Sequence, residues 1–506
     1  GLRLLYGFNH PEALRAFEEA GRLDPTLAMA WWGQAMALAP NLNAPMSEEH
    51  GTRAFAAVQS AVAKSRGASV LERNLIQALA QRIVADPTAA REPLNRAYAD
   101  AMARAAAAYA THPDVQVFYV DAVMNTMPWD YWQKAGAAKP ETETIRQVLE
   151  RVIAGHPTHA GAHHYFIHLM EGSPTPERAE ASADALGALM PSAGHMVHMP
   201  GHIYIRVGRY ADASEANVRA IAADEDYLAQ CQAQGLYPFS YYPHNLHFLW
   251  SAATFEGRSA VAIEAARDVA AKVPHHHAGA VAWTVDFPVT TLLAYTRFGK
   301  WKEILVEPAP PQTAPYAMGI WHYARTMAFI GRGELDRAER ELQALAAAMD
   351  HEAFKTTLKD TPLAINLQIA SRLTRAEYAA RRGALADAVT LATEAVALED
   401  AYPYAEPPIW HHPPRQVQGA LLLEAGKPIE AEAAYLADLS RFRENGWSLF
   451  GLAQSLEAQG KLEEARAVRA RFDKAWSRAD IVLTSSRVLE GARPVAPVRP
   501  TATARR

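Results

Sequence analysis

The sequence is poor in cysteine, in net charge and in long apolar runs, and each shortage excludes a class of protein. Among 506 residues Cys231 is the single cysteine, so an internal disulfide, an iron–sulfur cluster and a cysteine-type zinc finger are all excluded. A net charge of -5 and a pI near 6.5 provide no basic face for phosphate groups. No apolar run reaches the length of a membrane span. We therefore expect no nucleic-acid partner and no membrane-spanning helix.

The two ends of the sequence differ from its body. Between Arg487 and Arg506, five arginines and three prolines accompany a single acid, Glu490, which predicts a disordered basic tail. At the other end there is no signal peptide, and Gly1 is not an initiator methionine. The cellular compartment stays open, and export after removal of an upstream segment is one alternative.

The body of the sequence predicts an all-helical protein. Alanine-rich amphipathic segments recur along it, separated by glycine-containing turns, and no alternation of strand period stands out. In the segment HPEALRAFEEAGRLDP, the spacing of Ala13, Phe17, Ala20 and Pro25 resembles that of the 34-residue tetratricopeptide (TPR) repeat. The resemblance implies an α-solenoid of about ten TPR-like helical pairs that forms a superhelix with a concave groove.

The repeat register extends over most of the sequence. Pro157 and Pro191 lie 34 residues apart and end two consecutive units, and histidine-rich units follow, which mark a subgroup within the superfamily. The predicted unit starts are Ala160, Gly194, Pro243, Val285, Gly319, Ile369, His412 and Gly446. The register predicts N-terminal units with aromatic insertions over 1–157, histidine-rich central units over 158–300, C-terminal units over 301–486 and the tail over 487–506.

Histidine is concentrated in one quarter of the chain. Thirteen of the 20 histidines fall between His156 and His277. In TPR proteins, positions 2, 5, 9, 12 and 13 of each unit face the groove, and fifteen such positions in three units would hold about 0.6 histidine by chance. Here they hold seven histidines, which are His164, His168, His195, His198, His202, His244 and His247. Independently of the family, the i, i+3, i+4 and i+7 spacings within each group place these side chains on one helix face.

Imidazoles on neighbouring helices can share a metal ion, because packed helices lie about 8 to 10 Å apart. A set of imidazole and carboxylate ligands suits Zn, Fe, Cu or Mn. The number of ligands is sufficient for one or two ions. Glu171 and Asp286 are predicted as ligands or general bases, and Arg206 as an anchor for a substrate carboxylate or phosphate. Pro200 is expected to kink the helix of His195 and His202 or to delay its start.

Three functions remain open at this point. The first is a metal-dependent enzyme, hydrolytic or oxidative, that acts on a small molecule or chain end in the groove. The second is a TPR scaffold that binds a partner peptide, and the third is metal storage or delivery. The aromatic insertions around Trp129 and over 228–242 favour the enzyme, because they could form the walls of a pocket, whereas Trp410, His411 and His412 are interpreted as structural.

Overall fold

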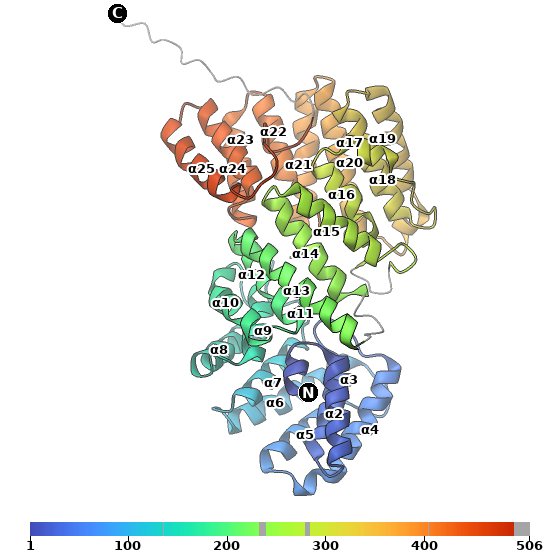
Figure 1. Ribbon diagram of the computed structural model, residues 1–506, viewed down its shortest axis with the longest axis vertical. Helices are drawn as coiled ribbons and strands as arrows, with labels where there is room; N and C mark the ends of the chain where they lie inside the picture. The colour runs from blue at the N-terminus through green and yellow to red at the C-terminus, as the bar shows by residue number, and fades with distance from the viewer. Residues whose placement is uncertain (135, 232–238, 279–283, 403, 490–506) are drawn as a thin grey trace, which may run out of the picture. The chain divides into compact units, whose positions relative to one another are not determined.

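The computed structural model describes residues 1–134, 136–231, 239–278, 284–402 and 404–489 (Figure 1). Within these ranges every extended regular element is a helix, and the only strand-like pairing is one antiparallel bridge between Trp132 and Ala138. The all-α prediction is confirmed. No helix in these ranges is both long and apolar enough to cross a membrane.

Contacts between residues divide the chain into two compact units, Gly1–Ile203 and Tyr204–Arg506. We describe each unit by itself. The boundary falls within α12 (Pro200–Val207). The first unit contains α1 (Leu2–Tyr6), α2 (His10–Leu23), α3 (Ala28–Leu38), α4 (Glu48–Lys64), α5 (Val70–Arg82), α6 (Arg91–Ala108), α7 (Pro113–Met124), α8 (Pro140–Gly155), α9 (Ala160–Met170), α10 (Glu180–Leu189) and α11 (Gly194–His198).

The second unit continues the series of helices from α13 onward. Its members are α13 (Tyr210–Cys231), α14 (Tyr241–Phe255), α15 (Ser259–Lys272), α16 (Thr290–Arg297), α17 (Trp301–Val306), α18 (Pro315–Gly331), α19 (Leu335–Met349), α20 (Pro362–Arg381), α21 (Leu385–Ala401), α22 (Pro414–Glu424), α23 (Pro428–Arg441), α24 (Gly446–Ala458) and α25 (Leu462–Ala475). Short 3-10 turns add η1 (Ser65–Gly67) and η2 (Pro176–Ala179) to the first unit and η5 (Phe287–Val289) and η6 (Glu352–Lys355) to the second.

Consecutive helices pack as pairs, as the repeat register predicts. In the second unit α18 packs on α19, α20 on α21 and α24 on α25 (Figure 1). The turn that joins α18 to α19 contains Gly333, and the turn that joins α20 to α21 contains Gly383. Their φ values are 75° and 80°, a left-handed conformation that glycine adopts without steric cost. The predicted solenoid of helical pairs is therefore confirmed.

The predicted unit starts agree with the helices to different degrees. Helix α9 begins at Ala160 and α24 at Gly446, as predicted. Helices α18 and α20 begin earlier, at Pro315 and Pro362, because proline at the first helical position has a preset φ and lacks only an amide hydrogen that would be unpaired there. The repeat register thus locates the packing positions rather than the first helical residue.

Two further predictions concern the C-terminal tail and the division of the chain into repeat regions. The predicted tail over 487–506 stays a prediction, and its first residue, Arg487, is buried and forms ion pairs with Glu377 and Glu424. Residues 490–506 lie outside the described residues, as do 232–238 of the second aromatic insertion. The three-part division of the body describes repeat content and stays a prediction.

Helix α9 is fixed at its start by two histidines that sequence analysis leaves outside the groove set. His159 caps the helix, since its Nδ1 accepts a hydrogen bond from the Ala162 amide at 3.1 Å, and its Nε2 lies 3.2 Å from Asp114 Oδ1. His163 packs against the next helix and bonds Ser182 Oγ at 2.9 Å. These contacts anchor the helix that carries His164 and His168.

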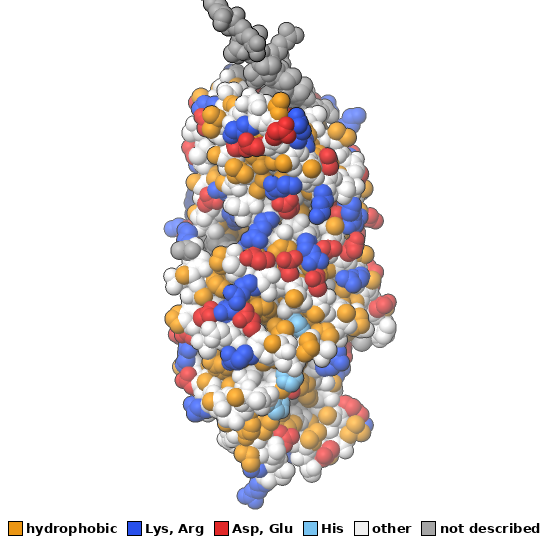
Figure 2. All heavy atoms as spheres, turned by 90° about the vertical axis from the view of Figure 1, so that its left-hand side faces the viewer, with side chains coloured by type: hydrophobic (Ala, Val, Ile, Leu, Met, Phe, Trp, Pro, Cys, Tyr) orange, Lys and Arg blue, Asp and Glu red, His pale blue; other side chains and the backbone are white. Residues whose placement is uncertain are grey.

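The surface carries charges of both signs. On the face drawn in Figure 2, lysine and arginine side chains alternate with aspartate and glutamate, and imidazole shows at only a few points.

Helix α9 approaches α1 closely at Gly161. A Cβ atom at this position would lie 2.7 Å from the ring of Tyr6, whose hydroxyl donates to Asp114 at 2.7 Å. We expect Gly161→Ala to displace this ring and to lower the free energy of unfolding by about 1 to 3 kcal/mol, as overpacking does. Urea unfolding checks the value. Gly155→Ala is the matched control, because nothing lies within 4 Å of its new methyl group; equal effects of both substitutions would contradict the close approach.

Candidate metal centre

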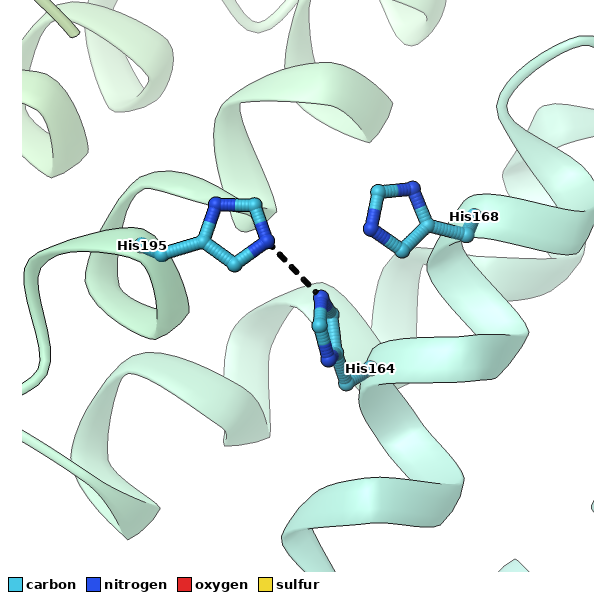
Figure 3. A group of neighbouring side chains, drawn as sticks. All are labelled: His164, His168 and His195. Carbon is cyan, nitrogen blue, oxygen red and sulfur yellow. Dashed lines mark hydrogen bonds between the residues drawn. The ribbon is translucent and has the colours of Figure 1, made fainter. Parts of the chain in front are cut away.

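Three imidazoles converge in the first unit. Helix α9 carries His164 and His168 one turn apart, and α11 carries His195. All three are buried, with 0%, 2% and 5% of their surface exposed. The Nε2 atoms of His164 and His195 lie 3.1 Å apart (Figure 3), and one ring nitrogen from each of the three residues lies within 4.8 Å of the others. This is the convergence that the repeat register predicts for these residues.

The second ring nitrogen fixes the tautomer of two of these imidazoles. Nδ1 of His164 lies 2.6 Å from the carbonyl oxygen of Tyr6, and Nδ1 of His168 lies 2.9 Å from Glu171 Oε1. Both oxygens only accept, so each Nδ1 must carry the hydrogen. In the neutral ring Nε2 then bears a free electron pair. For His168 this Nε2 is buried and has no hydrogen-bond partner among the described residues.

Burial keeps two of the imidazoles uncharged. Desolvation, followed by the neighbouring His168, holds the pKa of His164 well below 6.5, and desolvation followed by His164 does the same for His195. A neutral imidazole can bind a metal ion without first losing a proton. Burial thus favours the neutral, metal-binding form of His164 and His195.

Glu171 connects this group to a second pair of imidazoles. Its Oε2 lies 2.6 Å from Nδ1 of His202, whose Nε2 in turn lies 2.9 Å from Nε2 of His198. Burial opposes ionisation of Glu171, but the imidazoles of His202 and His168 outweigh it and lower its pKa from 4.5 to about 2. The carboxylate therefore stays charged and orients two imidazoles, the arrangement that fixes metal-ligating histidines.

Pro200 breaks the helix between these residues, as the sequence predicts. Helix α11 ends at His198 and α12 begins at Pro200, because proline cannot donate the hydrogen bond that would continue the first helix. His195 and His202 consequently lie on two short helices and not on one stripe. The amide of His202 reaches the Met199 carbonyl at 3.2 Å, a tighter turn than an α-helix.

Phe8 covers the three imidazoles. Its ring centroid lies 4.6 Å from that of His164, 5.7 Å from His168 and 5.5 Å from His195, and its φ of 53° is left-handed. Such a conformation is costly for an aromatic residue and persists only where the surroundings impose it. Sequence analysis did not identify Phe8 or the Tyr6 carbonyl, since both precede α9 by more than 150 residues.

Trp129, from the first aromatic insertion, closes the same group from another side. Its ring meets His168 edge-on at 5.3 Å, its Nε1 donates to the Leu42 carbonyl at 2.9 Å, and its φ of 62° is again left-handed. At 47% exposure it reaches solvent. Trp129 of this insertion therefore contacts His168 and is also exposed to solvent, and the role of the insertion as a pocket wall stays a prediction.

The remaining predicted site residues belong to the second unit. His244 and His247 lie on α14, and the ring of His247 packs against Trp250 and Phe287 at 4.9 and 4.7 Å, where burial lowers its pKa to about 3. Asp286 precedes η5, and burial raises its pKa to about 6. Neither His247 nor Asp286 joins a group of three candidate ligands in the described ranges, and their roles stay predictions.

Arg206 already has contacts within its own unit. Its Nε lies 3.9 Å from Glu406 Oε1, and its guanidinium lies 5.1 Å from the ring of Tyr404. A substrate anion would have to compete with Glu406. Its role as an anchor stays a prediction.

The described helices form a series of packed pairs, and this fold was compared with known proteins. No family model and no curated protein matches the sequence. Among solved structures, human IFIT1 determined as a dimer with m7Gppp-AAAA matches at 12% identity and a TM-score of 0.35, over 84% of this chain and 87% of that one. The Cut9 complex with Hcn1 matches at 10% identity and 0.35, over 81% and 80%, and yeast Tom70 at 10% and 0.30, over 76% and 89%. At these TM-scores the likeness carries no argument about this chain.

The Glu171 carboxylate is the contact to test in this site. We expect Glu171→Gln to weaken Zn²⁺ binding about 10- to 100-fold, because an amide has only one acceptor oxygen for the two Nδ1 hydrogens. Competition titration against a chromophoric chelator measures the affinity. Glu92→Gln, an exposed change on α6, should leave the affinity unchanged. An unaltered affinity in Glu171→Gln would show that the carboxylate does not orient the ligands.

Proposed function

We propose that this protein is a metal-dependent enzyme whose transition-metal ion is held by Nε2 of His164, His168 and His195. The observation that carries the proposal is the fixed tautomer of His164 and His168, whose Nδ1 hydrogens are committed to Tyr6 and Glu171. Nε2 of His164 lies 3.1 Å from Nε2 of His195 (Figure 3), and a bound ion would take the place of the hydrogen that these two nitrogens share. An all-imidazole set suits Zn, Cu or Fe, and His198 and His202 offer nitrogens for a second ion or for proton transfer.

Three ligands leave coordination positions for water or substrate, which is the difference between catalytic and structural zinc sites. The ion would polarise a bound oxygen or activate water or dioxygen, so hydrolysis and oxidation both remain open. Glu171 is assigned to positioning and not to general base catalysis, because Oε1 accepts from His168 Nδ1, Oε2 lies 2.6 Å from His202 Nδ1, and a pKa of about 2 makes the carboxylate a poor base at neutral pH.

The alternatives differ in what they require of this site. A solenoid that binds a partner peptide needs no ion, and the helical-repeat fold serves that role equally well. A storage protein needs ions that enter and leave, but no open coordination position.

The expectation that the protein binds no nucleic acid rests on the charge pattern of the sequence and stays a prediction.

The first experiment measures metal content. We expect the wild-type protein to hold about one equivalent of Zn, Cu or Fe per chain after mild purification or reconstitution, and His164→Ala, His168→Ala and His195→Ala each to hold less than about a tenth, since each removes one of three ligands. His50→Ala, an exposed change on α4, is the control. Equal metal in all variants, or none in wild type after reconstitution, would contradict the proposal.

A second measurement separates the enzyme from storage. The Co²⁺-substituted protein should change its visible spectrum when azide is added, because an open position accepts an exogenous ligand. A spectrum insensitive to azide would indicate a closed site and favour storage or a structural ion.

A further inference from the structure

A second group of buried polar side chains lies in the second unit, around Arg297 at the end of α16. This arginine is 2% exposed, and its guanidinium carbon lies 3.6 Å from the ring centroid of the fully buried Trp447. Nη2 donates to Gln416 Oε1 at 2.6 Å. Nε and Nη1 are buried without an acceptor in the part of the chain that the structure describes. A guanidinium cannot give up its charge in a protein, so these hydrogens need a partner.

Side chains near Arg297 carry further hydrogen-bond donors that have no acceptor among the described residues. Nε1 of Trp410, which is 1% exposed, lacks an acceptor among the described residues, as do Nδ1 of His411 and Nε2 of His412. The ring of Tyr323 joins them, with centroids 5.1 Å from Trp410 and 5.9 Å from His411. Indole and guanidinium groups can only donate hydrogen bonds, and an imidazole nitrogen that carries a hydrogen can also donate one. The group therefore has a surplus of donors.

The acids near this group are bonded mainly to other residues, and only Oδ1 of Asp438 is buried without a hydrogen-bond partner among the described residues. Gln416 passes a hydrogen bond on to Asp438 Oδ2 at 3.2 Å, and the same oxygen accepts from Asn445 and Ser448. Glu377 and Glu424 are paired with Arg487. Burial lowers the pKa of Arg297 to about 9, although Asp438 acts in the opposite direction, so the acid does not offset the desolvation of the guanidinium.

We propose that Arg297, Trp410 and His412 form a binding site for a compact monovalent anion, either a halide or a carboxylate of formate size. An anion supplies the acceptor that buried guanidinium and indole hydrogens lack. A single charge fits, because one guanidinium is unpaired and a dianion would place surplus negative charge beside Asp438. A small ion fits, because Arg297, Trp410 and Trp447 are almost completely removed from solvent.

The test follows thermal unfolding while bromide or formate replaces gluconate at constant ionic strength. The wild-type protein, first dialysed into gluconate, should show a saturable rise in Tm, because a ligand that binds the folded state stabilises it. Arg297→Met should lose this response, and Arg340→Met, an exposed change on α19, should keep it. The anion with the lower midpoint concentration identifies the ligand as halide or carboxylate.

Trp410→Phe retains a smaller aromatic ring and removes one donor, so it decides the question if Arg297→Met does not fold. We expect its midpoint concentration for the anion to rise about tenfold, as the loss of a hydrogen bond to a charged group does. In crystals soaked with bromide, the anomalous signal should lie beside the Arg297 guanidinium. A Tm that does not respond to either anion, or that responds equally in wild type and both variants, would overturn the proposal and leave water as the partner of these hydrogens.

Discussion

The Glu171 carboxylate is the contact on which the candidate metal centre depends. One oxygen accepts from Nδ1 of His168 and the other is within hydrogen-bond distance of Nδ1 of His202, so a single buried acid determines the tautomers of two imidazoles on two helices. A carboxylate with 1% exposure is costly unless it is fully bonded. The imidazoles stabilise the carboxylate, and the carboxylate in turn leaves the Nε2 electron pair of His168 available.

The other imidazoles are held by parts of the fold that are distant in sequence. The Tyr6 carbonyl fixes His164, and Phe8 in a left-handed conformation covers three rings together. Helix α1 is therefore part of the site, although it has only five residues. Its close packing on Gly161 sets where the Tyr6 carbonyl lies.

The sequence predicts this centre in part. The i, i+4 spacing of His164 and His168 and the 34-residue repeat together place His195 beside them, because consecutive repeats pack in a fixed register. The Tyr6 carbonyl could not be predicted, since a backbone oxygen carries no residue identity, and neither could the two tautomers. His247 shows the limit of the register: it occupies a groove position by count, but the aromatic rings of Trp250 and Phe287 surround it. Arg297 gave no sequence signal, because a lone arginine at a helix end is usually exposed.

The central claim is that three imidazole nitrogens bind one ion, and X-ray absorption at the edge of the bound metal tests it most directly. The account predicts about three nitrogen scatterers at about 2.0 to 2.1 Å with the outer-ring signals of imidazole, and one or two further light atoms from solvent. A first shell made of oxygen alone, without imidazole signals, would contradict it.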